Sequence, residues 1–206
     1  MSFYEQHILP HVIDVACGNK VIMDERASLL GEAEGRVLEV GMGSGLNLRY
    51  YNPDKVDFVW GLEPSEGMRK KAQKNLGRSP VNVEWLGLPG EEIPLDNDSA
   101  DTVVLTFTLC TIPDWQQALA QMRRVLKPGG KLLFCEHGAA PDASVLKWQN
   151  RINPLWKKIA GGCHLNRPIQ KYLEESGFQI KHIEMDYLPK TPRIAGFRYR
   201  GLAGIG

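Results

Sequence analysis

The feature that most constrains this chain is the alternation of short apolar segments with helical segments over residues 35–187. Runs such as FVWGL and TVVLTF are apolar at nearly every position, so strands of this kind have no face left for water. Strands that are buried on both faces and separated by helices predict a parallel sheet covered on both sides. We therefore expect an α/β, Rossmann-like, doubly wound fold. The predicted strands are residues 36–40, 56–62, 81–86, 101–107, 131–136 and 178–187, and the predicted helices include 46–50, 66–77, 115–126 and 169–176.

Composition and charge exclude several classes of protein. The 206 residues carry 25 Lys and Arg against 24 Asp and Glu, and this balance gives no field that attracts nucleic acid. No apolar run is long enough to span a membrane, and the first ten residues lack the pattern of a secretory signal, so we expect a cytoplasmic protein.

The four cysteines are too far apart in the sequence for a zinc-knuckle motif, and this spacing predicts free thiols and no metal site. They are Cys17, Cys110, Cys135 and Cys163.

A glycine-rich turn follows the first predicted strand and contains Gly41, Gly43 and Gly45. Ligands of a doubly wound sheet bind beyond the carboxyl ends of the strands, and glycine there lets the backbone approach the ligand closely. Glu63 ends the second predicted strand. A carboxylate only accepts hydrogen bonds, so at this position it suits the two vicinal hydroxyls of a ribose. These features predict a cofactor that contains a nucleoside.

The spacing of the glycines separates two classes of cofactor. The dinucleotide fingerprint is GxGxxG, whereas this chain has Leu46 after GxGxG. The missing third glycine disfavours an NAD-dependent oxidoreductase, which stays an alternative that cofactor-binding calorimetry distinguishes.

Together the motifs resemble the class I methyltransferases that use S-adenosylmethionine. The resemblance is carried by VLEVGMGSGLN, GLEPS, GEEIPLDNDSADTVVLTFTLC and RRVLKPGGKLLF, over nearly all of positions 35–187. It implies a seven-stranded sheet whose last strand is antiparallel, transfer of a methyl group, and S-adenosylmethionine as the cofactor. We expect a single domain of residues 1–206, with an N-terminal helical cap (1–34), a cofactor-binding half (35–137) and an acceptor-side insertion with C-terminal strands (138–206).

The resemblance also assigns cofactor-binding residues by position. It implies that Glu39 approaches the methionine ammonium group, that Glu63 binds the ribose hydroxyls, and that adenine lies near residues 88–91. Many relatives place an aspartate beside the adenine amino group, whereas this chain has Leu88-Pro89-Gly90, which leaves the backbone or Glu91 for that contact. The expected cofactor-binding residues are Glu39, Gly41, Gly43, Gly45, Asn47, Glu63, Pro64, Leu88, Gly90 and Glu91, with Thr106 and Leu109 near the sulfonium.

A narrower resemblance concerns the methyl acceptor. The stretches TFTLCTIPD, LLFCEHG and NPLWKKIAGGCHLNR look like bacterial relatives of the mammalian methyltransferase-like proteins described as alkyl thiol methyltransferases. This resemblance implies a small, apolar acceptor, with a thiol as the first choice. Bacterial phosphatidylethanolamine N-methyltransferases look similar over the same motifs, so a phospholipid amine is an alternative acceptor. A module that binds the cofactor without catalysis is another alternative.

Three residues are candidates for the chemistry on the acceptor side. Methyl transfer depends mainly on alignment of the acceptor, and an imidazole near a thiol raises its thiolate fraction. We interpret His137, just beyond the fifth predicted strand, as the base or thiolate partner. Glu136 then orients His137 or receives an amine, and His164 lies in the same region of the chain. The structural alternatives are a histidine that holds the insertion, a solvated carboxylate and, for Cys163, a packed thiol.

The N-terminal segment carries apolar side chains at helical spacing over residues 3–18. A helix there must bury its apolar stripe, either as a lid that brings Tyr4, His7 or His11 to the acceptor or by shallow adsorption to a lipid surface. The expected partners are thus a small-molecule acceptor, no nucleic acid, and a membrane surface touched through this helix. A monomer and a homodimer both stay open.

Overall fold

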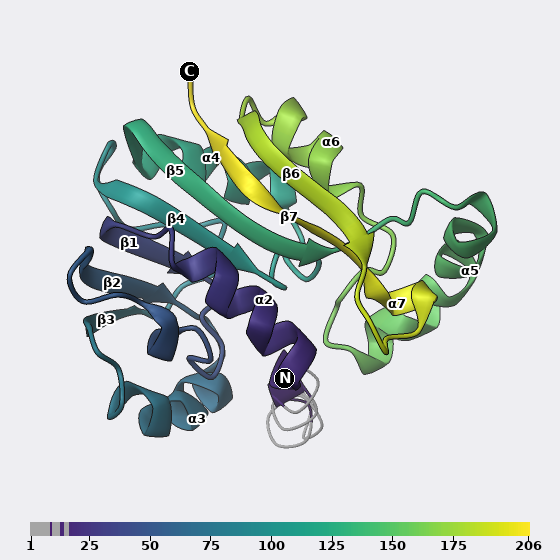
Figure 1. Cartoon of the computed structure of the whole chain (residues 1–206), viewed down its shortest axis with the longest axis horizontal. Coiled ribbons are helices and arrows are strands. Elements are labelled where there is room, and N and C mark those ends of the chain that lie inside the picture. Colours follow the sequence, from purple (N-terminus) through teal and green to yellow (C-terminus); the bar gives the residue numbers. More distant parts are fainter. Residues whose placement is uncertain (1–8, 10–12, 15–16) are drawn as a thin grey trace.

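The computed structural model describes residues 9, 13–14 and 17–206, so Tyr4, His7 and His11 lie outside the described residues. Seven strands form one sheet in the order β3-β2-β1-β4-β5-β7-β6 (Figure 1). Strands β1 to β5 pair in parallel, and β7 pairs antiparallel with both β5 and β6. The predicted doubly wound sheet with an antiparallel last strand is therefore confirmed.

The bounds of the elements follow the predicted segments closely over most of the chain. The strands are β1 (Gly35–Val40), β2 (Val56–Leu62), β3 (Asn82–Leu86), β4 (Ala100–Thr106), β5 (Leu126–His137), β6 (Gln179–Tyr187) and β7 (Phe197–Gly204). The helices are α2 (Lys20–Leu30), α3 (Glu66–Leu76), α4 (Trp115–Val125), α5 (Ala143–Ile159), α6 (Ile169–Glu175) and α7 (Arg193–Gly196), with a 3₁₀ turn η2 (Leu48–Tyr50).

Alternate residues of the central strands enter two cores on opposite faces of the sheet. Figure 1 shows α2 across one face and α4 and α6 on the other. Val37 and Val104 pack with Leu30 of α2, whereas Leu38 and Val103 belong to the core on the face of α4 and α6. Because both faces are dry, each central strand must be apolar at successive positions, and this explains the uniform runs in the sequence.

β5 begins at Leu126, five residues before the predicted strand at 131–136. The other differences from the predicted elements concern three helical segments. The predicted helix at 46–50 is only the turn η2, because Tyr51 is extended and Asn52 precedes Pro53, which disfavours helical backbone. Residues 87–99, all of them described, form no helix, so the alternation is incomplete between β3 and β4. Most of the insertion at 138–168 is the helix α5. The sequence does not predict this helix, because proline is disfavoured in a helix interior and Pro154 lies inside it.

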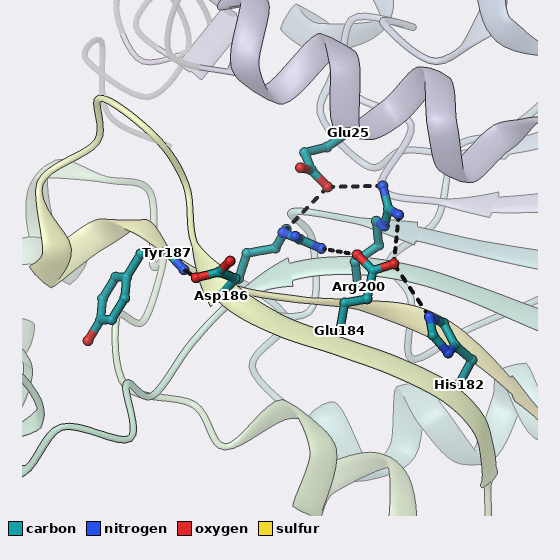
Figure 2. A network of polar contacts seen from close by, with 7 residues as sticks. Glu25, His182, Glu184, Asp186, Tyr187 and Arg200 are labelled. Carbon is teal, nitrogen blue, oxygen red and sulfur yellow. Dashed lines mark hydrogen bonds and ion pairs between the residues drawn. The ribbon is translucent and has the colours of Figure 1, made fainter.

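A network of ion pairs connects α2 to the neighbouring strands β7 and β6 (Figure 2). The Glu25 carboxylate on α2 lies 3.4 Å from both Arg198 Nε and Arg200 Nη1 on β7. The same two arginines pair with Glu184 on β6, at 3.2 and 3.0 Å. Glu25 thus fixes the position of α2 relative to β7.

No helix in the described part of the chain combines the length and apolar character that a membrane crossing requires.

We expect Glu25→Gln to lower the free energy of unfolding by about 1 to 3 kcal/mol, because it leaves largely buried guanidinium groups with one carboxylate partner fewer. Urea unfolding measures this change. The matched control is Asp24→Asn on the same helix, whose ion pair with Lys20 is 66% and 86% exposed. The control is expected to change stability by less than about 0.5 kcal/mol. Equal effects of the two substitutions would contradict an anchoring role for Glu25.

Candidate active site

The glycine turn after β1 lies directly against the end of β2. The backbone N–H groups of Gly41 and Met42 donate to the Leu62 carbonyl oxygen at 2.8 and 3.1 Å. Gly41 has a φ of +70°, and a Cβ on it would lie 2.2 Å from the Thr108 side chain. Only glycine meets both conditions, so the turn can bring bare backbone to the carboxyl edge of the sheet.

Glu63, at the end of β2, receives two hydrogen bonds from backbone. Gly43 N–H donates to Oε2 at 2.9 Å and Ser65 N–H donates to Oε1 at 2.8 Å. Burial raises the pKa of this carboxyl group, while the bonds from Ser65 and Gly43 lower it. Each oxygen retains a second lone pair that can accept from a hydroxyl. The position fits the predicted contact with the two hydroxyl groups of a ribose.

Glu39, near the end of β1, is buried on the face of the sheet that α2 covers. Its carboxylate accepts from Asn47 Nδ2 at 3.0 Å and from the Tyr51 hydroxyl at 2.7 Å. Burial raises the pKa of Glu39 to about 7, although Tyr51, Arg26 and Asn47 each lower it. A buried carboxylate with remaining lone pairs suits an ammonium group, which is the contact predicted for this residue.

Arg26 of α2 is a residue of the site that the sequence analysis missed. Its Nη1 donates to Asn47 Oδ1 at 2.8 Å and to Thr106 Oγ1 at 2.7 Å, and its Nε is buried without a hydrogen-bond partner among the described residues. The guanidinium group thereby places a positive charge beside Glu39, where it suits a ligand carboxylate. Helical periodicity is the sequence signal that could identify Arg26, because this residue shares the buried face of α2 with Leu29 and Leu30.

The residues predicted near adenine lie on the segment between β3 and β4. Gly90 is buried, with Ile112 Cδ1 at 3.1 Å from the place of a Cβ, and Leu88 is half-buried. Glu91 Oε1 accepts from the Asp114 N–H at 3.2 Å, and Pro64 is exposed. Glu91 therefore already helps to hold the start of α4, and the adenine contacts stay predictions.

Glu136 is fully buried near the end of β5 and fixes the loop that follows β4. Its Oε1 accepts from the backbone N–H groups of Thr108 at 2.7 Å and of Leu109 at 3.0 Å. Burial raises the pKa of Glu136 to about 7, against the effect of these two bonds. Arg167 holds the same loop from the other side, since its Nη1 donates to the carbonyl oxygens of Leu109 and Ile112. These contacts support a positioning role for Glu136, and its catalytic role stays a prediction.

His137, Cys163 and Cys110 come together beyond the carboxyl ends of β4 and β5. His137 Nε2 lies 3.1 Å from Cys163 Sγ, and Trp156 Nε1 donates to the same sulfur at 3.4 Å. One ligand atom of each of the three residues lies within 4.8 Å of the others. The sequence predicts Cys163 as a packed thiol next to His164. The structure instead pairs Cys163 with His137, and the His164 ring contacts Asn153 of α5.

The contacts within this cluster favour a thiolate at Cys163. The hydrogen bond with Cys110 lowers the pKa of Cys163, burial opposes that effect, and His137 lowers the pKa further. Burial by itself lowers the pKa of His137, but the contact with Cys163 raises it above its ordinary value. A histidine that gains a proton beside a thiolate forms an ion pair. The cluster therefore places an imidazole beside two soft sulfur groups.

Comparison with known proteins gives consistent matches. Residues 38–134 match a protein-family model described as a methyltransferase domain. The chain is 36% identical over 175 residues to human thiol S-methyltransferase TMT1B, covering 80% of this chain and 71% of that protein. It is 33% identical over 119 residues to phosphatidylethanolamine N-methyltransferase of Cereibacter sphaeroides, covering 55% and 57%. The fold matches a solved S-adenosylmethionine-dependent methyltransferase of Mesorhizobium loti with a TM-score of 0.66 at 19% identity, covering 90% and 98%.

Gly41→Ala is expected to weaken binding of S-adenosylmethionine by at least about tenfold, or 1.4 kcal/mol, because the new Cβ pushes the turn away from Thr108. Titration calorimetry measures the affinity. The matched control is Gly129→Ala, whose φ of +79° carries the same backbone strain but whose Cβ would meet nothing within 4 Å. The control is expected to keep the wild-type affinity. A similar loss of affinity in both variants would contradict a specific role for the turn.

Affinity for S-adenosylmethionine is expected to fall as the pH is lowered from about 7.5 to about 5.5, by about tenfold or more. The reason is that the Glu39 pKa of about 7 lets the carboxylate gain a proton in this range, while the ligand ammonium group stays charged. Glu39→Gln should bind weakly with a shallower pH dependence. An unchanged pH profile in Glu39→Gln would show that Glu39 does not bind the ammonium group.

Proposed function

This chain belongs to the S-adenosylmethionine-dependent methyltransferases, and on that premise we propose that it methylates the sulfur of a small, apolar thiol. When bound, the cofactor supplies a methyl carbon attached to a positively charged sulfur. The observation that carries the thiol proposal is the cluster of His137, Cys110 and Cys163 beyond the ends of β4 and β5. It adjoins the loop that contains Leu109, one of the residues expected near the sulfonium.

On the cofactor side, the residues form complementary charges and acceptors. Glu63 accepts from the ribose hydroxyls, and the glycine turn lets the ligand approach the backbone. Glu39 and Arg26 offer a negative and a positive group at the edge of β1 and β4, which suit the ammonium and carboxylate groups of the methionine portion. Thr106 belongs to the same network, since its hydroxyl accepts from both Arg26 and Asn47.

On the acceptor side, the residues supply alignment and charge. Glu136 and Arg167 bind the backbone of the loop after β4 from two directions, so the Leu109 backbone is held in place. Alignment of this kind is the main contribution that a protein makes to an in-line displacement. The three side chains gathered beside this loop are two thiols and one imidazole, so the cluster offers no carboxylate of its own to an acceptor's ammonium group. This donor set supports a thiol over an amine.

A phospholipid amine is the second candidate acceptor, and one surface feature favours it. Trp148, Leu155 and Ile159 of α5 are 55%, 64% and 51% exposed, and Lys157 and Lys158 end the same helix. A helix with exposed apolar residues and basic neighbours suits contact with a lipid surface. Helix α5 lies beyond the carboxyl end of β5 (Figure 1), so a lipid docked there would approach the acceptor side. The similarity to the Cereibacter enzyme agrees with this alternative.

An acceptor panel tests the proposal. The enzyme is incubated with S-adenosylmethionine that carries a labelled methyl group and with hexanethiol, hexanol, hexylamine or vesicles of phosphatidylethanolamine. We expect kcat/KM for the thiol to exceed that for the alcohol and the amine by at least about a hundredfold, because a thiolate forms near neutral pH and is the stronger nucleophile. The Gly41→Ala variant serves as the control for dependence on the cofactor site. Methylation of phosphatidylethanolamine without methylation of the thiol would replace the first proposal by the second.

A further inference from the structure

We propose that Cys110, His137 and Cys163 bind a thiophilic divalent cation of the zinc type and leave a fourth position at which the acceptor thiol coordinates. The ion site itself follows from the geometry alone. Only the identity of the fourth ligand rests on the proposed function. The sequence gives no hint of this site, because its three donors come from segments that are far apart along the chain.

The distances are close to those of a tetrahedral zinc site. With zinc–sulfur bonds of about 2.3 Å and zinc–nitrogen bonds of about 2.0 Å, ligand atoms lie about 3.6 to 3.8 Å apart. His137 Nε2 and Cys163 Sγ are separated by 3.1 Å, and all three donor atoms lie within 4.8 Å of one another. Adjustments of about 1 Å therefore convert the cluster into a metal site.

The three donors are held by separate, well-fixed elements. Cys110 lies in the loop after β4, which Glu136 and Arg167 bind through its backbone, and the Cys110 carbonyl oxygen accepts from His164 N–H at 2.9 Å. His137 is the last residue of β5, and Cys163 follows α5. Trp156 Nε1 donates to the Cys163 sulfur, the kind of supporting hydrogen bond that metal-bound thiolates receive. The cluster is thus positioned before any ion binds.

The donor set selects the kind of ion. Two cysteine sulfurs and one imidazole favour zinc over magnesium or calcium, which prefer oxygen ligands. The carboxylate of the neighbouring Glu136 does not belong to this group of donors. Its Oε1 accepts from backbone N–H groups, and its buried Oε2 has no hydrogen-bond partner among the described residues. Structural zinc sites use four protein ligands, whereas catalytic sites use three and keep one position open. Three donors among the described residues therefore point to a site that takes an exogenous ligand.

A thiol that enters the fourth position loses its proton to solvent, because coordination to zinc strongly favours the thiolate. The acceptor sulfur then forms a bond to the methyl carbon. The bond between that carbon and the sulfonium sulfur breaks, and its electron pair stays on the departing sulfur. One thiol and one methyl sulfonium thus give a methyl thioether, a neutral thioether and one proton. The product sulfur carries no charge and is a weaker ligand, so it leaves the ion.

Cobalt(II) is the probe that reports both binding and ligand type. Reduced, chelator-treated full-length protein is titrated with cobalt(II), and the visible bands of tetrahedral cobalt and the sulfur-to-cobalt charge-transfer band are recorded. We expect one cobalt per chain with thiolate ligands. Cys110→Ala and Cys163→Ala should each weaken binding by at least about tenfold. Cys135→Ala is the matched control, since it removes a buried thiol outside the cluster, and it should keep the wild-type spectrum.

Wild-type protein that binds no cobalt, or cobalt spectra that persist in both cluster variants, would overturn the site regardless of how the variants fold. Hexanethiol added to the cobalt form should increase the sulfur-to-cobalt band. An unchanged band would overturn the assignment of the acceptor thiol as the fourth ligand.

A methylation assay separates the ion site from the proposed function. Thiol methylation at an unchanged rate by metal-free enzyme would overturn a catalytic role for the ion while leaving the proposed function intact. Cobalt binding by an enzyme that methylates no thiol would instead reject the proposed function and retain the ion site.

Discussion

Burying a carboxylate is costly unless its oxygens accept hydrogen bonds, and both oxygens of Glu39 do so by bringing several elements together. Asn47 and Tyr51, on either side of η2, donate to it. Asn47 in turn accepts from Arg26 of α2, which also donates to Thr106 at the end of β4. The polar groups of the cofactor side therefore form one connected network, and their positions depend on one another. Loss of any member leaves a buried polar group without its partner.

The acceptor side is organised around a second buried carboxylate on the opposite face of the sheet. Glu136 belongs to the side of β5 that carries Leu132 and Phe134, and it holds the backbone after β4 as Glu39 holds the chain after β1. Because the carboxyl ends of parallel strands share one edge, both carboxylates act at the same edge of the sheet. This arrangement explains how residues from the two halves of the chain meet at one site.

The sequence predicts the sheet well, because its strands must be apolar on both faces and their runs are therefore easy to recognise. It also predicts Gly41 and Glu63, since their chemistry depends on their place after a strand and not on a distant partner. Contacts between distant segments leave no such pattern. His137 and Cys163 are 26 residues apart, and only the path of α5 brings them together. Arg26 was missed for a related reason, because an arginine on a helix is usually a solvated residue.

We expect the cofactor sulfur and the acceptor sulfur to meet beside the loop after β4, which contains Leu109 and Cys110. A crystal structure of the chain with S-adenosylhomocysteine and an alkyl thiol tests this most directly. It should show the ribose hydroxyls on Glu63 and the thiol sulfur at the cluster of Cys110, His137 and Cys163, facing the cofactor sulfur. A thiol bound elsewhere, or a nucleoside that does not contact Glu63, would contradict the account.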